Sequence, residues 1–197
     1  MSASMSWYWF AGSLGTSPAM HTPQRAKTMI MFQHEVDIWF RLSHPHVVRL
    51  FSDCHIGKPF FVCEYATNGT LVSYLRKHPN EIWAKLHEAA LGVQYLHSRG
   101  FVHCDLKGNN IVIGSDMKAK VTNFGLSVYA TGRYESKISD ASHWVAPECF
   151  IYENAQPTFA SDIYSLGMCI VEALRVVGLE ETRENFVFLG ELLTAML

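Results

Sequence analysis

The hydrophobic pattern of the chain changes its period at Gly100, which restricts the fold to one that combines a long helix with short strands. Apolar residues between Ile82 and Leu96 recur at helical spacing and predict an amphipathic helix that ends with Gly100 at its C′ position. Three short apolar runs, separated by polar loops, follow at 101–102, 111–113 and 119–121. The first loop, residues 103–110, is densely polar, and we expect any chemistry of the chain to lie there.

Further elements are predicted on both sides of this region. Apolar spacing predicts a helix over residues 28–43, stopped by Pro45, and a short helix over residues 71–77. Runs of β-branched and aromatic residues predict an antiparallel strand pair at 47–51 and 60–65. A last helix is expected from a cap at Ser161 to about Ala173. The pattern as a whole therefore predicts an α+β protein.

Composition excludes several classes of function. The 16 Lys and Arg residues do not exceed the 18 Asp and Glu residues, so no basic excess is present to bind phosphate backbones, and we expect no nucleic-acid partner. A chain that is 49% hydrophobic and 17% charged is globular and is neither a disordered tail nor a coiled coil. The longest late apolar stretch, Ile163 to Leu174, contains Glu172 and is shorter than the ~20 residues of a spanning helix. We therefore expect no membrane partner.

Cysteine and histidine usage bears on location and metal binding. The five cysteines are odd in number and none stands in a C-x-x-C spacing, which favours a reducing, cytoplasmic location. The ten histidines include no H-E-x-x-H motif and no Cys/His zinc spacing. A structural zinc site is therefore not predicted.

The polar loop begins a series of motifs. It reads His-Cys-Asp-Leu-Lys-Gly-Asn-Asn over residues 103–110, and Asn-Phe-Gly follows at 123–125. Ala-Pro-Glu stands at 146–148, and Ser-Asp-Ile-Tyr-Ser-Leu-Gly at 161–167. In order and spacing the series resembles the H-R-D-L-x-x-x-N, D-F-G and A-P-E motifs of protein kinases and the helix that comes after them.

Residues upstream extend the resemblance to roughly residues 28–175. Glu35 matches the glutamate of helix αC, here 28–43, and the run Val-Cys-Glu-Tyr-Ala at 62–66 matches the hinge between the lobes, near 64–66. Trp144 before Ala-Pro-Glu is similar to the tyrosine-kinase-like branch, whose members mostly phosphorylate Ser and Thr. The resemblance implies a two-lobed protein-kinase-like α+β fold. Its lobes are a reduced, β-rich N-lobe over 1–66 and an incomplete, mostly helical C-lobe over 67–197.

The resemblance also implies ATP and Mg²⁺ as cofactors and a protein substrate or signalling partner. Phosphoryl transfer requires a positioned acceptor hydroxyl and neutralised phosphate charge. Asp105 would then accept the hydroxyl proton, Lys107 would lie beside the γ-phosphate, and Asn110 would offer its amide oxygen to a metal. The remaining assignments are nucleotide contacts at Glu35, Glu64 and Ala66, and a second metal position at Asn123.

Other matched residues have packing roles in the family. His103 and Phe124 are expected to stack with Trp39 into an apolar set that aligns the lobes, and Asp162 to anchor the backbone of the loop at 103–110. Cys104 stands where the family has an arginine that contacts a phosphorylated activation loop, and we interpret it as a packed small residue. Residues 126–145, which correspond to that loop, show no period and are either functional or mobile.

Two departures from the family pattern predict impaired activity. Asn123 offers a dipole where the family places a charged aspartate. A charge pair at 4 Å and an effective dielectric of 20 contributes about 4 kcal/mol, equivalent to a roughly thousandfold change in rate. The Gly-rich loop and the strand-three lysine are also missing, since Gly12 and Gly15 have the wrong spacing and the lysine position falls near His21, with Lys27 already at the helix start.

Four interpretations of function follow. The first is a kinase-like Ser/Thr phosphotransferase domain with impaired or absent transfer, a pseudokinase in signal transduction. The second is a non-catalytic interaction scaffold that uses the helical lobe and residues 126–145. The third is a chain that does not fold on its own. The fourth is a weakly active ATP-binding kinase in which His21 or Lys27 replaces the missing lysine.

Overall fold

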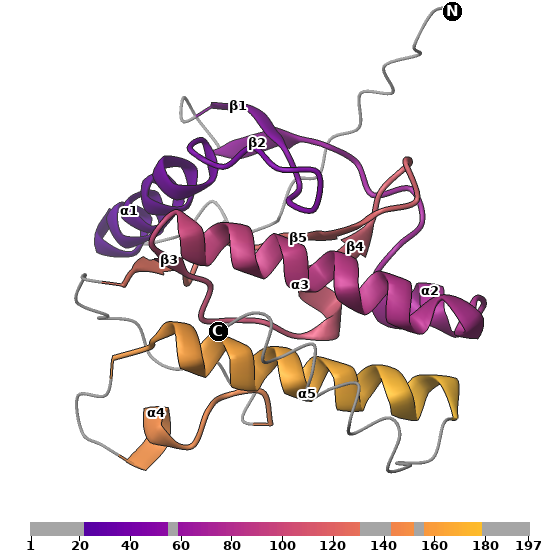
Figure 1. Ribbon diagram of the computed structural model, residues 1–197. Helices are drawn as coiled ribbons and strands as arrows, with labels where there is room; N and C mark the ends of the chain where they lie inside the picture. The colour runs from indigo at the N-terminus through magenta and orange to yellow at the C-terminus, as the bar shows by residue number, and fades with distance from the viewer. Residues whose placement is uncertain (1–21, 55–58, 131–142, 152–155, 179–197) are drawn as a thin grey trace, which may run out of the picture.

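A computed structural model describes residues 22–54, 59–130, 143–151 and 156–178. Its first part holds helix α1 (Thr22–Trp39) and the strands β1 (Leu50–Cys54) and β2 (Phe60–Cys63). The long helices α3 (Ile82–Ser98) and α5 (Phe159–Val177) form its second part, where they lie side by side and run in opposite directions (Figure 1). The smaller elements are α2 (Leu71–Leu75), η1 (Pro79–Glu81), β3 (Phe101–Val102), η2 (Gly108–Asn110), β4 (Ile111–Ile113), β5 (Ala119–Val121), β6 (Val128–Tyr129) and α4 (Glu148–Ile151).

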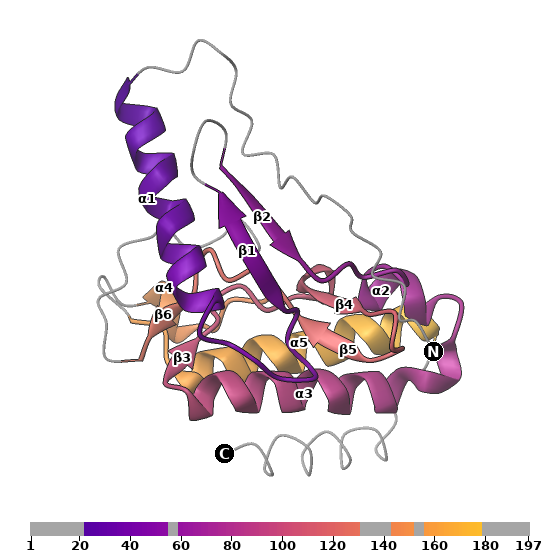
Figure 2. The same cartoon turned by 90° about the horizontal axis from the view of Figure 1, so that it is seen from above.

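Helix α1 and the β1–β2 pair agree with the predicted elements but differ in their ends. The helix spans Thr22–Trp39, so it begins and ends earlier than the predicted 28–43, and Lys27 lies within it as expected. Strands β1 and β2 pair antiparallel, from Leu50 opposite Cys63 to Cys54 opposite Phe60. Figure 2 shows α1 beside this strand pair, both of them above α3 and α5. Gly12, Gly15 and His21 lie outside the described residues.

The helix predicted to end at Gly100 is confirmed as α3. Its buried side consists of apolar residues spaced three and four apart, namely Ile82, Leu86, Ala89, Val93 and Leu96. Gly100 follows with a φ of +81°, a left-handed conformation that glycine adopts without a steric penalty. This turn directs the chain into β3.

The three apolar runs after Gly100 are confirmed as β3, β4 and β5. Strand β4 pairs antiparallel with β5, and β3 pairs antiparallel with β6. The polar loop 103–110 therefore has a strand on each side, and η2 closes its end. Strand β5 also contacts α3, so the strand pair that follows the loop packs on this helix (Figure 2).

Helix α5 begins with a cap different from the one expected. Thr158 is the N-cap, and its hydroxyl oxygen accepts the backbone N–H of Ser161. Ser161, predicted as the cap, lies three residues later and accepts the N–H of Thr158 in return. The helix continues to Val177, beyond the predicted end at Ala173, and Gly178 ends it with a φ of +70°.

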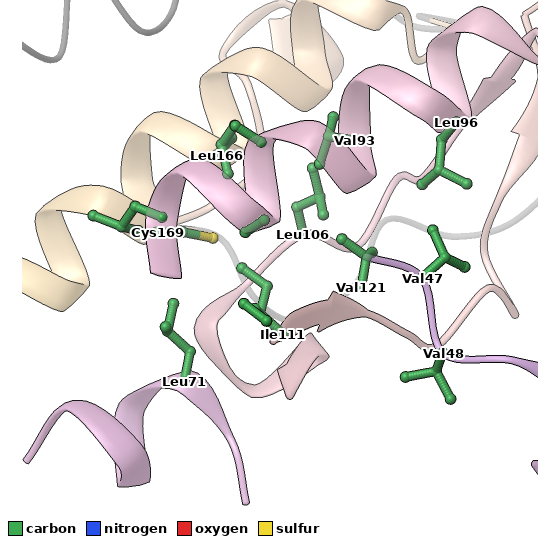
Figure 3. Close-up of a cluster of buried hydrophobic side chains, with 14 of the residues drawn as sticks. Val47, Val48, Leu71, Val93, Leu96, Leu106, Ile111, Val121, Leu166 and Cys169 are labelled. Atoms are coloured by element: carbon green, nitrogen blue, oxygen red, sulfur yellow. The ribbon is translucent and has the colours of Figure 1, made fainter. Parts of the chain in front are cut away.

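One hydrophobic core joins these elements. Figure 3 shows side chains from α2, α3, α5, the strands β4 and β5, the segment before β1 and the polar loop converging: Val47, Val48, Leu71, Val93, Leu96, Leu106, Ile111, Val121, Leu166 and Cys169. Residues from distant parts of the chain thus bury one another, and the combination of helices with short strand pairs confirms the predicted α+β class. Among the described residues, none of the helices has both the length and the apolar character that crossing a membrane requires.

Candidate active site

The polar loop brings three predicted catalytic residues into one hydrogen-bonded cluster. Lys107 Nζ lies 3.0 Å from both carboxylate oxygens of Asp105. Asn110 Nδ2 donates to the backbone oxygen of Asp105 at 2.7 Å and to its Oδ2 at 2.8 Å. The Asp105 carboxylate is thus oriented by a cation and an amide, as the alignment of an acceptor hydroxyl requires.

Asn123 joins this cluster as a hydrogen-bond donor. Its Nδ2 lies 3.3 Å from Asp105 Oδ2 and 3.2 Å from Asn110 Oδ1. Its φ of +70° is in the left-handed region, which Asn tolerates better than most residues. The substitution therefore suits the backbone but places N–H groups where an aspartate would present only oxygens.

The donor set does not fit a tightly held Mg²⁺. Asn110 and Asn123 offer neutral amide oxygens, and the Asp105 carboxylate is paired with Lys107. Protein-bound Mg²⁺ is usually held by one or two carboxylates together with substrate phosphates. In the described ranges, no three His, Cys, Asp or Glu side chains cluster as metal ligands. The metal roles assigned to Asn110 and Asn123 stay predictions that this geometry does not favour.

Asp162 anchors the loop from α5, as the resemblance implied. The side chain is only 1% exposed, and it accepts the backbone N–H of His103 at 2.7 Å and of Cys104 at 3.0 Å. His97 Nε2 lies 2.9 Å from the same carboxylate. Cys104 has a φ of +68°, so the carboxylate holds a strained backbone at this point.

The expected aromatic stack is also present. The Phe124 ring lies 5.6 Å from Trp39 and 5.5 Å from His103, measured between ring centroids. His103 and Phe124 are fully buried. Burial lowers the pKa of His103, because it disfavours the charged imidazolium, although the Asp162 carboxylate opposes this shift. The stack therefore contains a neutral imidazole and connects α1 with the polar loop.

Cys104 is packed, as interpreted from the sequence. Burial raises the pKa of its thiol, and the nearby Asp162 carboxylate raises it further. The thiol Sγ lies 3.5 Å from the backbone oxygen of Val102. A thiol that stays protonated is a poor nucleophile, so the geometry does not support a reactive cysteine here.

Glu35 lies beside Phe124 and Gly125, and no Lys or Arg among residues 29–54, 59–130, 143–149 and 156–178, whose side chains the structure describes, forms an ion pair with it. The backbone N–H of Phe124 faces its carboxylate and lowers the pKa of Glu35. A Cβ on Gly125 would lie 3.2 Å from Glu35 Oε2, so the two residues are in close contact. Burial raises the pKa of Glu35 more than the Phe124 N–H lowers it.

The hinge residues lie away from the Asp105 cluster. Glu64 forms an ion pair with Lys120 of β5, and Arg49 N–H lies 3.4 Å from the other carboxylate oxygen. Lys120 is only 6% exposed and also pairs with Asp116 at 3.1 Å. Ala66 is half-buried in the connection between β2 and α2. The Glu64 side chain is thus used within the protein, and any nucleotide contact at Glu64 and Ala66 stays a prediction.

Two site residues escaped the sequence analysis. Residues 119–121, which include Lys120, were predicted only as an apolar strand. Nothing in the sequence indicated that Lys120 pairs with Glu64. Glu172 accepts the backbone N–H of Gly108 at 3.0 Å. A Cβ on Gly108 would lie 2.7 Å from both Glu172 Oε2 and Val72 Cγ2. The sequence did contain a signal for Glu172, because it is the one acidic residue in the apolar stretch 163–174.

Comparisons with known proteins agree with this geometry. The family described as protein tyrosine and serine/threonine kinase matches residues 19–182. The serine/threonine/tyrosine-protein kinase HT1 of Arabidopsis thaliana is 34% identical over 167 residues, which cover 79% of this chain and 41% of the relative. The ephrin type-A receptor 7 of Gallus gallus is 35% identical over 158 residues, which cover 73% of this chain and 15% of the receptor.

A third relative is the mitogen-activated protein kinase kinase kinase 5 of Arabidopsis thaliana, 28% identical over 162 residues that cover 76% of this chain and 23% of the relative. The chain thus spans less than half the length of these curated relatives. Their names include both serine/threonine and tyrosine specificities, and the kinase resemblance drawn from the motifs is confirmed. With its motifs in order around one loop and the family match over most of its length, the chain belongs to the protein tyrosine and serine/threonine kinase family.

Proposed function

We propose that this chain is a kinase-family domain in which transfer of the ATP γ-phosphate to a protein hydroxyl is impaired or absent, and that it acts in signal transduction by binding other proteins. The observation that carries this proposal is the Asn123 amide, which donates to both Asp105 Oδ2 and Asn110 Oδ1. An amide N–H directed at these oxygens competes with a cation for the same acceptors. The position used in the family for a charged metal ligand thus serves here as a hydrogen-bond donor.

The retained packing supports a binding role. The Trp39–Phe124–His103 stack and the Asp162 anchor fix the shape of the loop without requiring a metal. A fixed shape is what a protein-binding surface needs, whereas transfer also needs phosphate charge to be neutralised. The cysteines are free, which fits a reducing compartment and supports a cytoplasmic location.

The test combines thermal unfolding with a transfer assay on the full chain. We expect cooperative unfolding and no Mg²⁺-ATP-dependent incorporation of phosphate into a generic protein acceptor. A ligand at 100 times its Kd adds about 2.7 kcal/mol to the folded state, so a shift in Tm reports nucleotide binding independently of transfer. Incorporation well above background that Asp105→Asn abolishes would contradict the proposal. Absence of a cooperative transition would instead support a chain that does not fold on its own.

A charge-restoring variant sharpens the test. Asn123→Asp returns the carboxylate, and we expect it to increase the effect of Mg²⁺ on Tm without producing transfer. The reason is that the strand-three lysine of the family is also missing from the sequence. Asn109→Asp is the matched control, because it adds the same charge at an exposed position outside the cluster. Transfer at an ordinary kinase rate in Asn123→Asp alone would show that the missing lysine is dispensable.

A weakly active kinase is the second candidate. It is favoured by the Asp105–Lys107 pair and by the continuous stack from Trp39 to His103, which preserve the orientation of the acceptor side of the site. This candidate predicts slow incorporation that Asp105→Asn abolishes and Asn123→Asp increases. Transfer assays on Asp105→Asn and Asn123→Asp therefore distinguish the two candidates.

A further inference from the structure

Helix α1 binds the backbone of the segment after Asn123 at two points. His34 Nε2 lies 2.7 Å from the backbone oxygen of Ser127. A carbonyl oxygen only accepts, so the imidazole must donate through Nε2–H. The adjacent Glu35 lies against Gly125, where an added Cβ would come within 3.2 Å of its Oε2, and it faces the Phe124 N–H. Two neighbouring side chains of α1 thus hold both ends of the short turn in which Ser127 N–H donates to Phe124 O at 3.0 Å.

Ser127 continues this contact into the polar loop. Its side chain is 1% exposed, and its hydroxyl donates to the backbone oxygen of His103 at 3.0 Å. The N–H of His103 in turn donates to Asp162 of α5 at 2.7 Å. An unbroken series of hydrogen bonds therefore runs from His34 on α1, through Ser127 and His103, to Asp162 on α5.

We propose that His34 is a positioning residue that sets the place of α1 against the polar loop through the Ser127 carbonyl. Among the side chains that the structure describes from residue 29 onward, Glu35 has no cationic partner; its carboxylate faces the Phe124 N–H and lies against Gly125. His34 supplies the second attachment. It is next to Glu35 in sequence, and the residue that it binds, Ser127, lies three positions after Phe124. The inference goes beyond the proposed function and holds whether or not the domain transfers phosphate.

The experiment measures amide hydrogen exchange in the full chain by NMR. His34→Ala removes the donor, and we expect the Phe124 N–H to exchange about fivefold to tenfold faster, because the turn then has one attachment to α1. Phe124 is informative because its N–H faces Glu35 and does not bond His34. His34→Gln places an amide N–H near the position of Nε2 and should restore slow exchange.

His87→Ala is the matched control, since His87 is an exposed histidine on α3. It should leave the exchange of Phe124 unchanged. Amides in the buried middle of α3 report the global stability of each variant. The proposal is overturned if His34→Ala leaves Phe124 unchanged, if it accelerates α3 and Phe124 equally, or if His34→Gln behaves like His34→Ala.

A second measurement needs no substitution. The ¹⁵N shifts of the His34 ring distinguish a proton on Nε2 from one on Nδ1 in the neutral imidazole. We expect the neutral His34 ring to carry its proton on Nε2, because the tautomer with its proton on Nδ1 has no Nε2–H to donate to Ser127. A neutral His34 with its proton on Nδ1 would contradict the proposal even if the alanine variant failed to fold.

Discussion

Two glycines inside helices have opposite surroundings, although both stand in similar apolar helical patterns. A Cβ on Gly92 of α3 would collide with the backbone oxygen of His46 and lie 2.9 Å from Val121 Cγ2. A Cβ on Gly167 of α5 would meet nothing within 4 Å. Gly92 permits α3 to approach the backbone before β1. Gly167 has no such role, and it only increases the conformational entropy that the unfolded chain loses on folding.

We predict that Gly92→Ala and Gly167→Ala change stability in opposite directions. Gly92→Ala should lower the free energy of unfolding by about 1–3 kcal/mol, because a backbone carbonyl has little room to move. Gly167→Ala should raise it by about 0.4–1 kcal/mol through the entropy of the unfolded chain. Urea denaturation of both variants measures the two values. Equal effects of the two substitutions would refute the assignment of a close approach at Gly92.

The residues that the sequence predicted and those it missed differ in how far away their partners are. Asp105, Asn110 and Asn123 were predictable because a motif fixes their spacing. His34 contacts a residue 93 positions away and Glu172 one 64 positions away. Lys120 pairs with Glu64 across 56 positions. Hydrophobic period carries no information on such pairs, because only the folded chain brings them together.

At the scale of elements, the predicted types were right and the ends were set by tertiary contacts. The pattern extended the first helix to residue 43 because Leu42 continues the apolar spacing, and Leu42 is buried in the structure. In the structure α1 ends at Trp39, and the N–H of Ser43 donates to the Tyr95 hydroxyl of α3 at 3.0 Å. Leu42 therefore reaches the core from a turn. A single sequence does not distinguish this arrangement from another helical turn.

The start of α5 offers a prediction at this scale. Thr158→Ala removes the hydroxyl that caps the helix and should lower the free energy of unfolding by about 0.5–2 kcal/mol. Asp162, which accepts the N–H groups of His103 and Cys104, lies in the first turn of α5. Fraying of this turn should therefore also speed the exchange of these two amides. Thr158→Ser keeps the hydroxyl and is the control. Unchanged exchange at both amides in Thr158→Ala would show that the anchor does not depend on the cap.

At the scale of the whole molecule, the buried His103 and the half-buried His44 connect the two parts of the fold and make stability depend on pH. His103 lies in the stack beneath α1, and its Nε2 is 3.0 Å from the backbone oxygen of Thr122. His44, after α1, stacks on Tyr95 of α3 with ring centroids 4.7 Å apart. Burial lowers the pKa of His103 and of His44. Both rings are therefore more basic in the unfolded chain than in the folded protein.

We predict that the protein loses stability as the pH falls below 6.5, the ordinary pKa of histidine. Between this value and the lower folded pKa, the unfolded chain binds protons that the folded protein does not. The free energy of unfolding then decreases by up to about 1.4 kcal/mol per pH unit for each such proton, and the contribution is fully present above pH 6.5. Urea denaturation at a series of pH values from 7.5 downward measures this slope.

His103→Phe separates the effect of this ring from that of His44. The variant keeps an aromatic ring against Phe124 but cannot make the hydrogen bond to the Thr122 oxygen, so its stability should be lower at neutral pH. Because the new ring cannot titrate, the slope of stability below pH 6.5 should be shallower than that of the unaltered chain. Glu35 acts with the opposite sign, because a raised carboxyl pKa reduces stability as the pH rises above 4.5. Repeating the series in Glu35→Gln removes this contribution. If the slopes of His103→Phe and the unaltered chain then agree, His103 is not a source of the pH dependence.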